Sequence, residues 1–167
     1  LAGQLVGAFI PPIICSLLKG QALKLSINHD ATYLTAFIAE CIGCVLFYSV
    51  VLLQSKEKED LHSGDESISA LIVALSLGAG AAIAGNVSGA GLNPAIGLAL
   101  NTVGFFWTDY DSLYIKDLPI YIFAPLLAAP IANFLVIFVF QTESKKEELP
   151  ESLSRSLVTK KSSIDQF

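Results

Sequence analysis

Residues 85–107 read Gly85-Asn-Val-Ser-Gly-Ala-Gly-Leu-Asn93-Pro-Ala-Ile-Gly-Leu-Ala-Leu-Asn-Thr-Val-Gly-Phe-Phe-Trp107. This stretch is too apolar for an ordinary loop and too interrupted to cross a membrane as one helix. Asn93 followed by Pro94 indicates a helix start, because the Asn side chain caps free backbone N–H groups and proline loses no hydrogen bond there. We expect a short helix from Pro94 toward Phe105, preceded from Gly85 by extended, glycine-rich backbone.

The composition is that of a membrane protein. Hydrophobic residues make up 53% of the 167 residues and charged residues 15%, against about 25% charged in an ordinary soluble domain. Four apolar stretches approach the roughly 20 residues that a membrane-spanning helix needs. They are residues 1–18, 32–53, 68–84 and 119–140. The sequence therefore predicts an all-α membrane bundle over residues 1–140.

Residues 85–107 lie between the third and fourth of these spans. Irregular backbone survives at membrane depth only where it is buried in protein or lines a water-filled cavity. We therefore expect a re-entrant loop followed by a half-helix. The pair Pro11-Pro12 should kink the first span, and Gly3, Gly7, Gly78 and Gly80 should allow close helix packing.

Lysine and arginine are unevenly distributed between the two sides that alternating spans create. One side carries Lys56, Lys58, Lys145, Lys146 and Arg155, with Lys160 and Lys161 further along the chain, and the other carries Lys19, Lys24 and Lys116. The positive-inside rule then places residues 54–67 and 141–167 in the cytoplasm. The charged, Ser-rich composition of 141–167 predicts a disordered tail.

The sequence contains no Met, and Leu1 already lies inside a hydrophobic segment. We expect that it is the later part of a longer membrane protein, either through processing or through truncation.

Several motifs resemble those of the aquaporin and aquaglyceroporin (major intrinsic protein) family. Ser88-Gly-Ala-Gly-Leu-Asn93-Pro-Ala resembles the family's second Asn-Pro-Ala box. Gly3-Gln4-Leu-Val-Gly7-Ala8 resembles the Ala-Gln-x-x-Gly-Ala of its third span, and Ala124-Pro125-Leu-Leu-Ala-Ala the Gly-Pro-Leu-x-Gly-Gly of its sixth. The resemblance extends to about Phe140 and implies that spans one and two, with the first box, precede this sequence.

The resemblance implies a passive channel in which Asn93, Pro94 and Ala95 form the pore box. The half-helix would point its positive dipole end at the membrane centre and repel cations, and the Asn93 amide would turn passing water molecules. The implied assembly is a homotetramer in which each protomer has its own pore. It would lie in the lipid bilayer of the plasma membrane or the vacuole.

The selectivity filter departs from that of most water-selective members. Ile96 stands where they have Arg, and the neighbouring filter positions, carried over by spacing, are Ala90 and Ala81. All three residues are apolar, and two are small. We expect a wide, weakly polar mouth that passes water and small neutral solutes such as glycerol, urea, ammonia or peroxide, with a weakened barrier to cations.

Glu40 is the sole carboxylate inside an expected span, although the Thr that commonly follows four residues later is Cys44 here. An isolated charge at that depth costs several kcal/mol unless it is bonded. The resemblance implies that Glu40 holds backbone N–H groups of the re-entrant loop, with Gly89 and Gly91 as further loop-supporting residues. A proton relay and a simple interface position near a mobile helix end are the alternatives.

No grouping of nucleophile, base and oxyanion donors indicates an enzyme, and we expect no cofactor, no metal site and no nucleic-acid partner. Cys15, Cys41 and Cys44 lie in apolar segments and are typical of small buried hydrophobes. Two other functions stay open: a non-conducting family member with a role in adhesion or membrane organisation, and a secondary transporter, since broken helices also build transporter sites.

Overall fold

A computed structural model describes residues 2–55 and 64–140, and in these ranges every regular element is helical. The α-helices are α1 (Ala2–Lys19), α2 (Tyr33–Gln54), α3 (Glu66–Ser88), α4 (Pro94–Trp107) and α5 (Leu118–Leu135). A 3-10 turn, η1 (Ser112–Tyr114), precedes α5, and a π-helix, η2 (Val136–Phe140), follows it. The expected all-α membrane bundle is confirmed. The expected tail, residues 141–167, lies outside the described residues.

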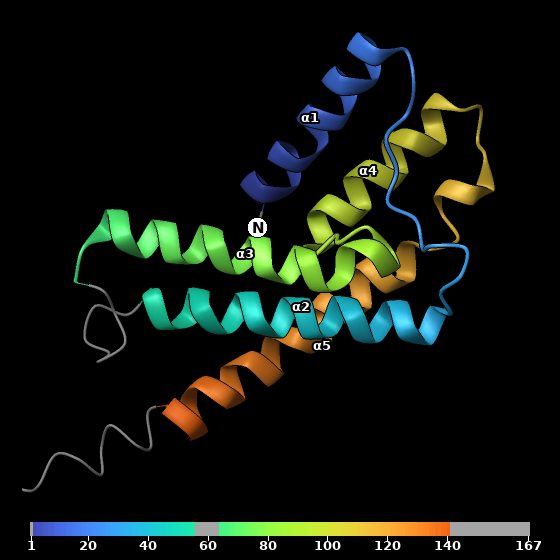
Figure 1. Cartoon of the computed structure of the whole chain (residues 1–167). Helices are drawn as coiled ribbons and strands as arrows, with labels where there is room; N and C mark the ends of the chain where they lie inside the picture. The colour runs from blue at the N-terminus through green and yellow to red at the C-terminus, as the bar shows by residue number, and fades with distance from the viewer. Residues whose placement is uncertain (1, 56–63, 141–167) are drawn as a thin grey trace, which may run out of the picture.

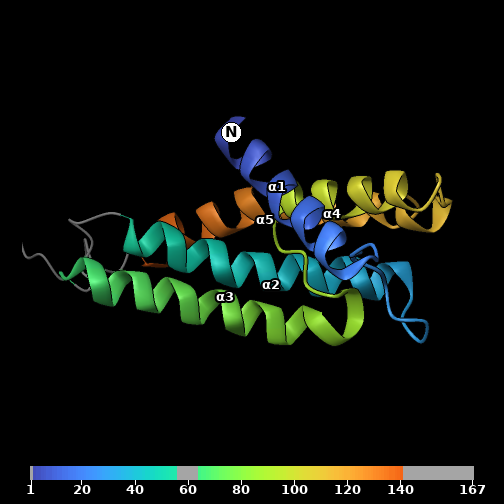
Figure 2. The same ribbon diagram turned by 90° about the horizontal axis from the view of Figure 1, so that it is seen from above.

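Two packed groups of helices build the bundle (Figure 1). The long helix α2 packs against both α3 and α5. The shorter α4 packs against α1 and α5, and seen from above α1 crosses over this second group (Figure 2). Because α5 contacts both α2 and α4, it joins the two groups.

Helices α2 and α3 approach each other closely at two glycines. A Cβ atom added at Gly80 would lie 2.8 Å from the carbonyl oxygen of Gly43, and one added at Gly43 would lie 2.9 Å from that of Gly80. The packing role expected for Gly80 is therefore confirmed. For Gly3, Gly7 and Gly78, an added Cβ would meet no described atom within 4 Å, so for these three glycines the packing role stays a prediction.

Three helical segments are long and apolar enough to cross a membrane: Tyr33–Gln54, Glu66–Ser88 and Ser112–Val139. Gly3–Lys19 is a shorter apolar helix, so three of the four expected spans reach full length in the described ranges. Large apolar side chains such as Leu71 (58% exposed) and Leu75 (64%) point outward, as lipid-facing helix surfaces require. Helix α1 continues through Pro11 and Pro12 without a break.

Local capping chemistry explains where the helices begin and end. Thr32 and Thr35 form a reciprocal capping box at the start of α2, and Asp65 accepts from two N–H groups at the start of α3. At the other end of α3, Gly89 adopts a left-handed φ of 84°, which is a favourable helix stop. The expectation that extended backbone begins at Gly85 is therefore wrong, because α3 continues through Ser88.

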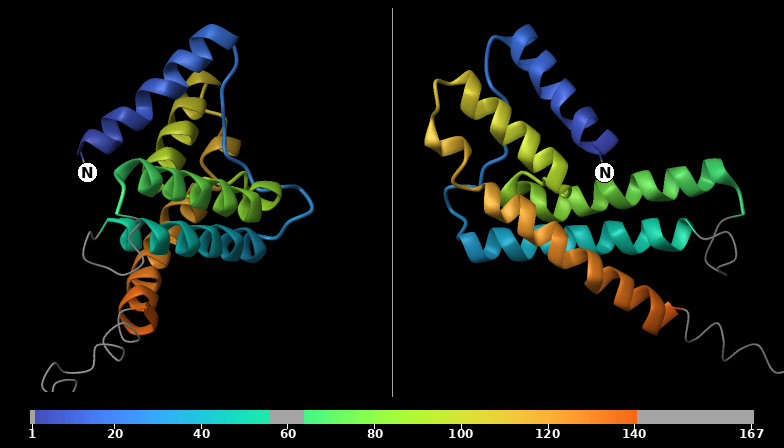
Figure 3. Two further views of the ribbon diagram at one scale, coloured as in Figure 1. Left: turned by 60° about the vertical axis from the view of Figure 1, so that its left-hand side comes forward. Right: turned by 180° about the vertical axis from the view of Figure 1, so that it is seen from behind.

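The helix ends lie on two sides. The end of α2, the start of α3 and the end of η2 lie on one side of the bundle (Figures 1 and 3). The connecting segment between α1 and α2, residues 20–32, runs past α4 on its way to the start of α2 (Figure 1).

Candidate functional site

The site begins at the N-terminus of α4. Asn93 has extended backbone (φ −152°, ψ 122°), and its side-chain Oδ1 accepts a hydrogen bond from the N–H of Ala95 at 2.9 Å. Pro94 occupies the first helical turn, and the N–H of Gly97 donates to the Asn93 carbonyl at 3.0 Å. The start at Pro94 is as expected, and the helix ends at Trp107, two residues beyond Phe105.

Close packing holds α4 against α5. An added Cβ at Gly97 would clash with the Cβ of Tyr121, and one at Gly91 would lie 2.9 Å from the Tyr121 ring. Tyr121 is fully buried, and its hydroxyl donates to the Ser88 carbonyl at 2.6 Å. The absence of side chains at these two glycines therefore sets how near the half-helix lies to α5.

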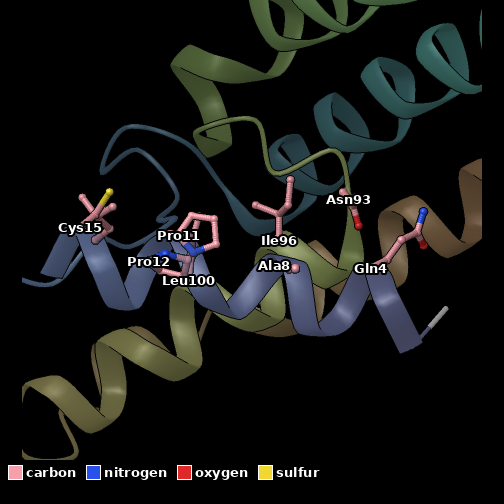
Figure 4. Close-up of a pocket in the computed structure, with 10 residues that line it drawn as sticks. Gln4, Ala8, Pro11, Pro12, Cys15, Asn93, Ile96 and Leu100 are labelled. Carbon is pink, nitrogen blue, oxygen red and sulfur yellow. The ribbon is translucent and has the colours of Figure 1, made fainter. Parts of the chain in front are cut away.

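A cavity of about 390 Å³ opens between α1 and the start of α4 (Figure 4). Its wall is mostly apolar, and its polar side chains are the amides of Gln4 and Asn93 and the thiol of Cys15. Ile96, 41% exposed, projects from the first turn of α4. The complete lining is Gln4, Gly7, Ala8, Pro11, Pro12, Cys15, Leu23, Asn93, Ile96 and Leu100.

The loop before α4, residues 89–93, is held by one carboxylate from α2. Glu40 is fully buried. Its Oε1 accepts from the Gly91 N–H at 2.8 Å and from the Ser88 hydroxyl at 2.5 Å, and its Oε2 accepts from the Leu92 N–H at 2.9 Å. Both carboxylate oxygens are thus used, and the hydrogen bonds that the resemblance implied for Glu40 are present.

This loop carries two residues in left-handed backbone, Ala90 (φ 57°) and Leu92 (φ 48°). Such a conformation costs a non-glycine residue roughly 1–2 kcal/mol. Burial offsets the cost at Leu92, which is 2% exposed and wedges its side chain against both Gly43 and Gly80. The loop is therefore tied to the point where α2 and α3 approach most closely.

Two tyrosines hold carbonyl groups at the ends of the loop. The Tyr48 hydroxyl donates to the Leu92 carbonyl at 3.0 Å, as Tyr121 does to Ser88. Neither tyrosine is among the site residues predicted from the sequence. The available signal was a tyrosine inside an apolar span, because a buried hydroxyl needs a hydrogen-bond partner.

A second group of contacts ties the connecting segment to the site. The Leu25 N–H donates to Oδ1 of Asn101 on α4 at 3.1 Å, and the Ile27 N–H to Oδ2 of Asp117 at 3.2 Å. The Asn28 N–H donates to the Val87 carbonyl at 2.9 Å. Asn101 is fully buried and Asp117 is 2% exposed. Neither Asn101 nor Asp117 is among the site residues predicted from the sequence.

The expected filter residues fall into two places. Ile96 lies beside Asn93 on the cavity wall. Ala81 and Ala90 are partly buried and pack against the core cluster, which consists of Cys44, Ala84, Leu92 and Ala128. The structure therefore brings Asn93 and Ile96 together, and it places Ala81 and Ala90 against the neighbouring α2–α3 core.

Comparison with individual curated proteins gives no match. The family model described as major intrinsic protein matches residues 1–156, which include every helix of the described residues and the site built on Glu40 and Asn93. The apolar helices and this match make the chain a multi-pass integral membrane protein. It belongs to the major intrinsic protein family, whose members are membrane channels for water and small solutes rather than enzymes.

Proposed function

We propose that this chain forms part of the wall of a passive pore for water and small neutral solutes, with glycerol, urea, ammonia and peroxide as candidate solutes. The observation that carries the proposal is the position of Asn93. Its side chain caps a half-helix inside the bundle and also lines a cavity beside Ile96. A polar cap at the start of a half-helix places hydrogen-bonding groups where a single solute in the cavity can contact them.

The hydrogen bonds of Asn93 determine what it offers to a solute. Its side-chain oxygen already accepts from the Ala95 N–H, so the amide N–H groups remain as donors. A water or hydroxyl oxygen in the cavity would accept such a bond and be oriented by it. The N-terminus of α4 adds about half a positive elementary charge, which opposes the passage of cations and hydronium.

Ile96 supports a pore that also admits larger neutral solutes. Ile96 lies in the first turn of α4 and contributes an aliphatic side chain, which has no charge and no hydrogen-bond donor, to the cavity wall. The volume of about 390 Å³ lies within the ~300–1,000 Å³ typical of small-molecule sites. With Ala81 and Ala90 as the other two filter positions, we propose a wide filter that selects by size and neutrality.

For Glu40 we propose a structural role in which it holds the 89–93 loop, with Gly89 and Gly91 permitting the backbone path. Its two oxygens accept three hydrogen bonds, and it is fully buried away from the cavity. A proton relay needs a carboxylate with free access to a proton path. The contacts of Glu40 therefore favour a channel over a proton-coupled transporter.

We further propose a homotetramer in the plasma or vacuolar membrane, with one pore per protomer and the tail in the cytoplasm. The lysine distribution supports this orientation. The ends of α2 and η2 lie on one side of the bundle. Residues 56–63 and 141–167 follow these two ends, which also supports the proposed orientation.

Stopped-flow permeability of vesicles containing the natural protein tests the proposal. Wild type should raise water, glycerol and urea entry above that of protein-free vesicles. Ile96→Arg should spare water and lower glycerol and urea entry about tenfold, because it narrows the mouth and adds a charge, whereas Ile96→Leu keeps the apolar volume and should change little. Folded, inserted protein with no permeability above background would favour the non-conducting role.

A further inference from the structure

We propose that Asn101 is a positioning residue for the size cut-off of the pore, acting through Leu25 on the loop that precedes Asn93. The inference rests on the proposed channel function and deepens it. It starts from the hydrogen bond between Leu25 N–H and Asn101 Oδ1, which is buried and joins residues 76 positions apart. This bond fixes one point of the connecting segment to the half-helix that carries Asn93 and Ile96.

Leu25 transmits that position to the 89–93 loop. A Cβ atom added at Gly91 would lie 3.1 Å from Cδ1 of Leu25, and one added at Gly89 would lie 3.4 Å from Cδ2. The Leu25 side chain therefore reaches the loop at the two positions where the loop has no side chains. Leu25 is itself 9% exposed, so it packs as a core residue.

The loop is thus held in two different ways. Glu40 binds its N–H groups from α2, which fixes the loop through polar contacts. Leu25 packs on Gly89 and Gly91 from the connecting segment, which limits how far the loop moves. Ala90, a proposed filter residue, lies between those two glycines.

Asn101 is the residue that sets where Leu25 lies. The hydrogen bonds from Ile27 to Asp117 and from Asn28 to Val87 act further along the connecting segment, and the Lys24 ammonium lies 5.4 Å from the centroid of the Tyr114 ring. Asn101 binds the backbone of Leu25 itself. Its amide Nδ2 is buried and has no hydrogen-bond partner among the described residues, so its side-chain oxygen supplies the contact that matters here. When this oxygen is lost, Leu25 should withdraw from the loop while the remaining anchors stay in place.

The test compares variants of the natural protein in vesicles, measuring the erythritol-to-glycerol permeability ratio. Asn101→Leu removes the acceptor while keeping the branching of the side chain at Cγ, and it should raise the ratio at least threefold, because a looser loop relaxes the size limit. Asn101→Asp keeps an oxygen and should stay within twofold of wild type. Leu25→Ala should reproduce the effect of Asn101→Leu with the anchor intact, and the double variant should show no more than the larger single effect.

Asp117→Leu is the matched control, because it frees the Ile27 N–H and leaves the Asn101 contact to Leu25. Its ratio should stay within twofold of wild type. Amide hydrogen exchange at residues 89–92 should rise at least tenfold in Asn101→Leu and Leu25→Ala and much less in Asp117→Leu. This measurement does not depend on conduction, so it separates the inference from the proposed function. Wild-type vesicles with background permeability would contradict the proposed function and with it the role in the size limit, whereas unchanged exchange at residues 89–92 in Asn101→Leu would contradict the positioning of the loop by Asn101.

Three results would overturn the inference: an unchanged ratio in Asn101→Leu, an equal change in Asp117→Leu, or independent, multiplying effects in the double variant. If the first of these results came with faster exchange at residues 89–92, Asn101 would have only a structural role.

Discussion

Replacing Glu40 tests the central contact of the site. The carboxylate accepts from the N–H groups of Gly91 and Leu92 at 2.8 and 2.9 Å and is fully buried. In Glu40→Gln one amide oxygen remains, so one of the two N–H groups must face an NH2 group and lose its partner. An unpartnered buried N–H costs about 1–3 kcal/mol, and hydrogen bonds to charged groups lie at the upper end of this range. We therefore expect Glu40→Gln to lower the stability of the loop that Glu40 holds by about 2–3 kcal/mol.

The left-handed residues of the loop make this loss local. Ala90 and Leu92 each carry roughly 1–2 kcal/mol of backbone strain, which relaxes once the carboxylate no longer holds the loop. Residues 88–93 should therefore open before the helices do. A loss of 2–3 kcal/mol corresponds to exchange of the Gly91 and Leu92 amides that is roughly 30- to 150-fold faster.

Hydrogen exchange followed by mass spectrometry of the protein in detergent or nanodiscs measures this change. Glu40→Ala, which removes both acceptors, should increase exchange further than Glu40→Gln. Glu66→Gln provides the control, because Glu66 is an exposed carboxylate in the first turn of α3 and should change stability by less than about 0.5 kcal/mol. Exchange at residues 88–93 within twofold of wild type in Glu40→Gln would refute the reasoning.

Three further changes probe neighbouring contacts. Gly97→Ala should destabilise the fold by about 1–3 kcal/mol in thermal unfolding, because the new methyl group clashes with Tyr121. Tyr121→Phe should cost about 1–2 kcal/mol, since the Ser88 carbonyl loses the hydroxyl that binds it at 2.6 Å. A thiol reagent should inhibit permeation through Cys15, which lines the cavity, and Cys15→Ser should abolish that inhibition.

Matched variants control for these effects. Gly78→Ala adds the same methyl group where it meets nothing described, so it should be neutral or stabilise by up to about 1 kcal/mol. Tyr110→Phe removes a hydroxyl from a side chain that is 64% exposed and should change little. Inhibition that persists in Cys15→Ser and disappears in Cys44→Ser would contradict the cavity lining, because Cys44 is fully buried.

Local rules predict the parts of this structure that local chemistry determines. The start of α4 follows from Asn93 and Pro94 alone, because both the cap and the missing donor are properties of neighbouring residues. Long apolar runs likewise predict α2 and α3 within a few residues at most boundaries. Gly85 marks the limit of such reasoning, since Gly85 and Gly89 both allow a helix stop. The left-handed Gly89 and the Tyr121 bond to Ser88 extend the helix to Ser88.

The connecting segment shows why part of the site escapes sequence analysis. Asn101 lies in the mostly apolar helix α4, and one polar residue in such a helix does not by itself indicate a partner. Its partner, the Leu25 N–H, belongs to a loop 76 residues earlier, and a backbone group carries no sequence signal. The packing of Leu25 on Gly89 and Gly91 is equally non-local. Spacing along one chain does not predict contacts of this kind, whereas Glu40 was noticed because an intramembrane carboxylate demands a partner.

In the proposed pore, Ile96, at the position where the resemblance implies Arg in most water-selective members, changes which interactions keep ions out. At about 5 Å and an effective dielectric constant of about 20, the half charge at the start of α4 repels a cation by about 2 kcal/mol. An arginine there would roughly triple the charge and the repulsion. The cavity wall, however, offers an ion few polar side chains beyond Gln4 and Asn93, so a dehydrated ion would lose several kcal/mol of solvation with little compensation. In the proposed pore, dehydration in an apolar cavity, with the helix dipole as the smaller term, would therefore let Ile96 widen the mouth for neutral solutes while ions remain excluded.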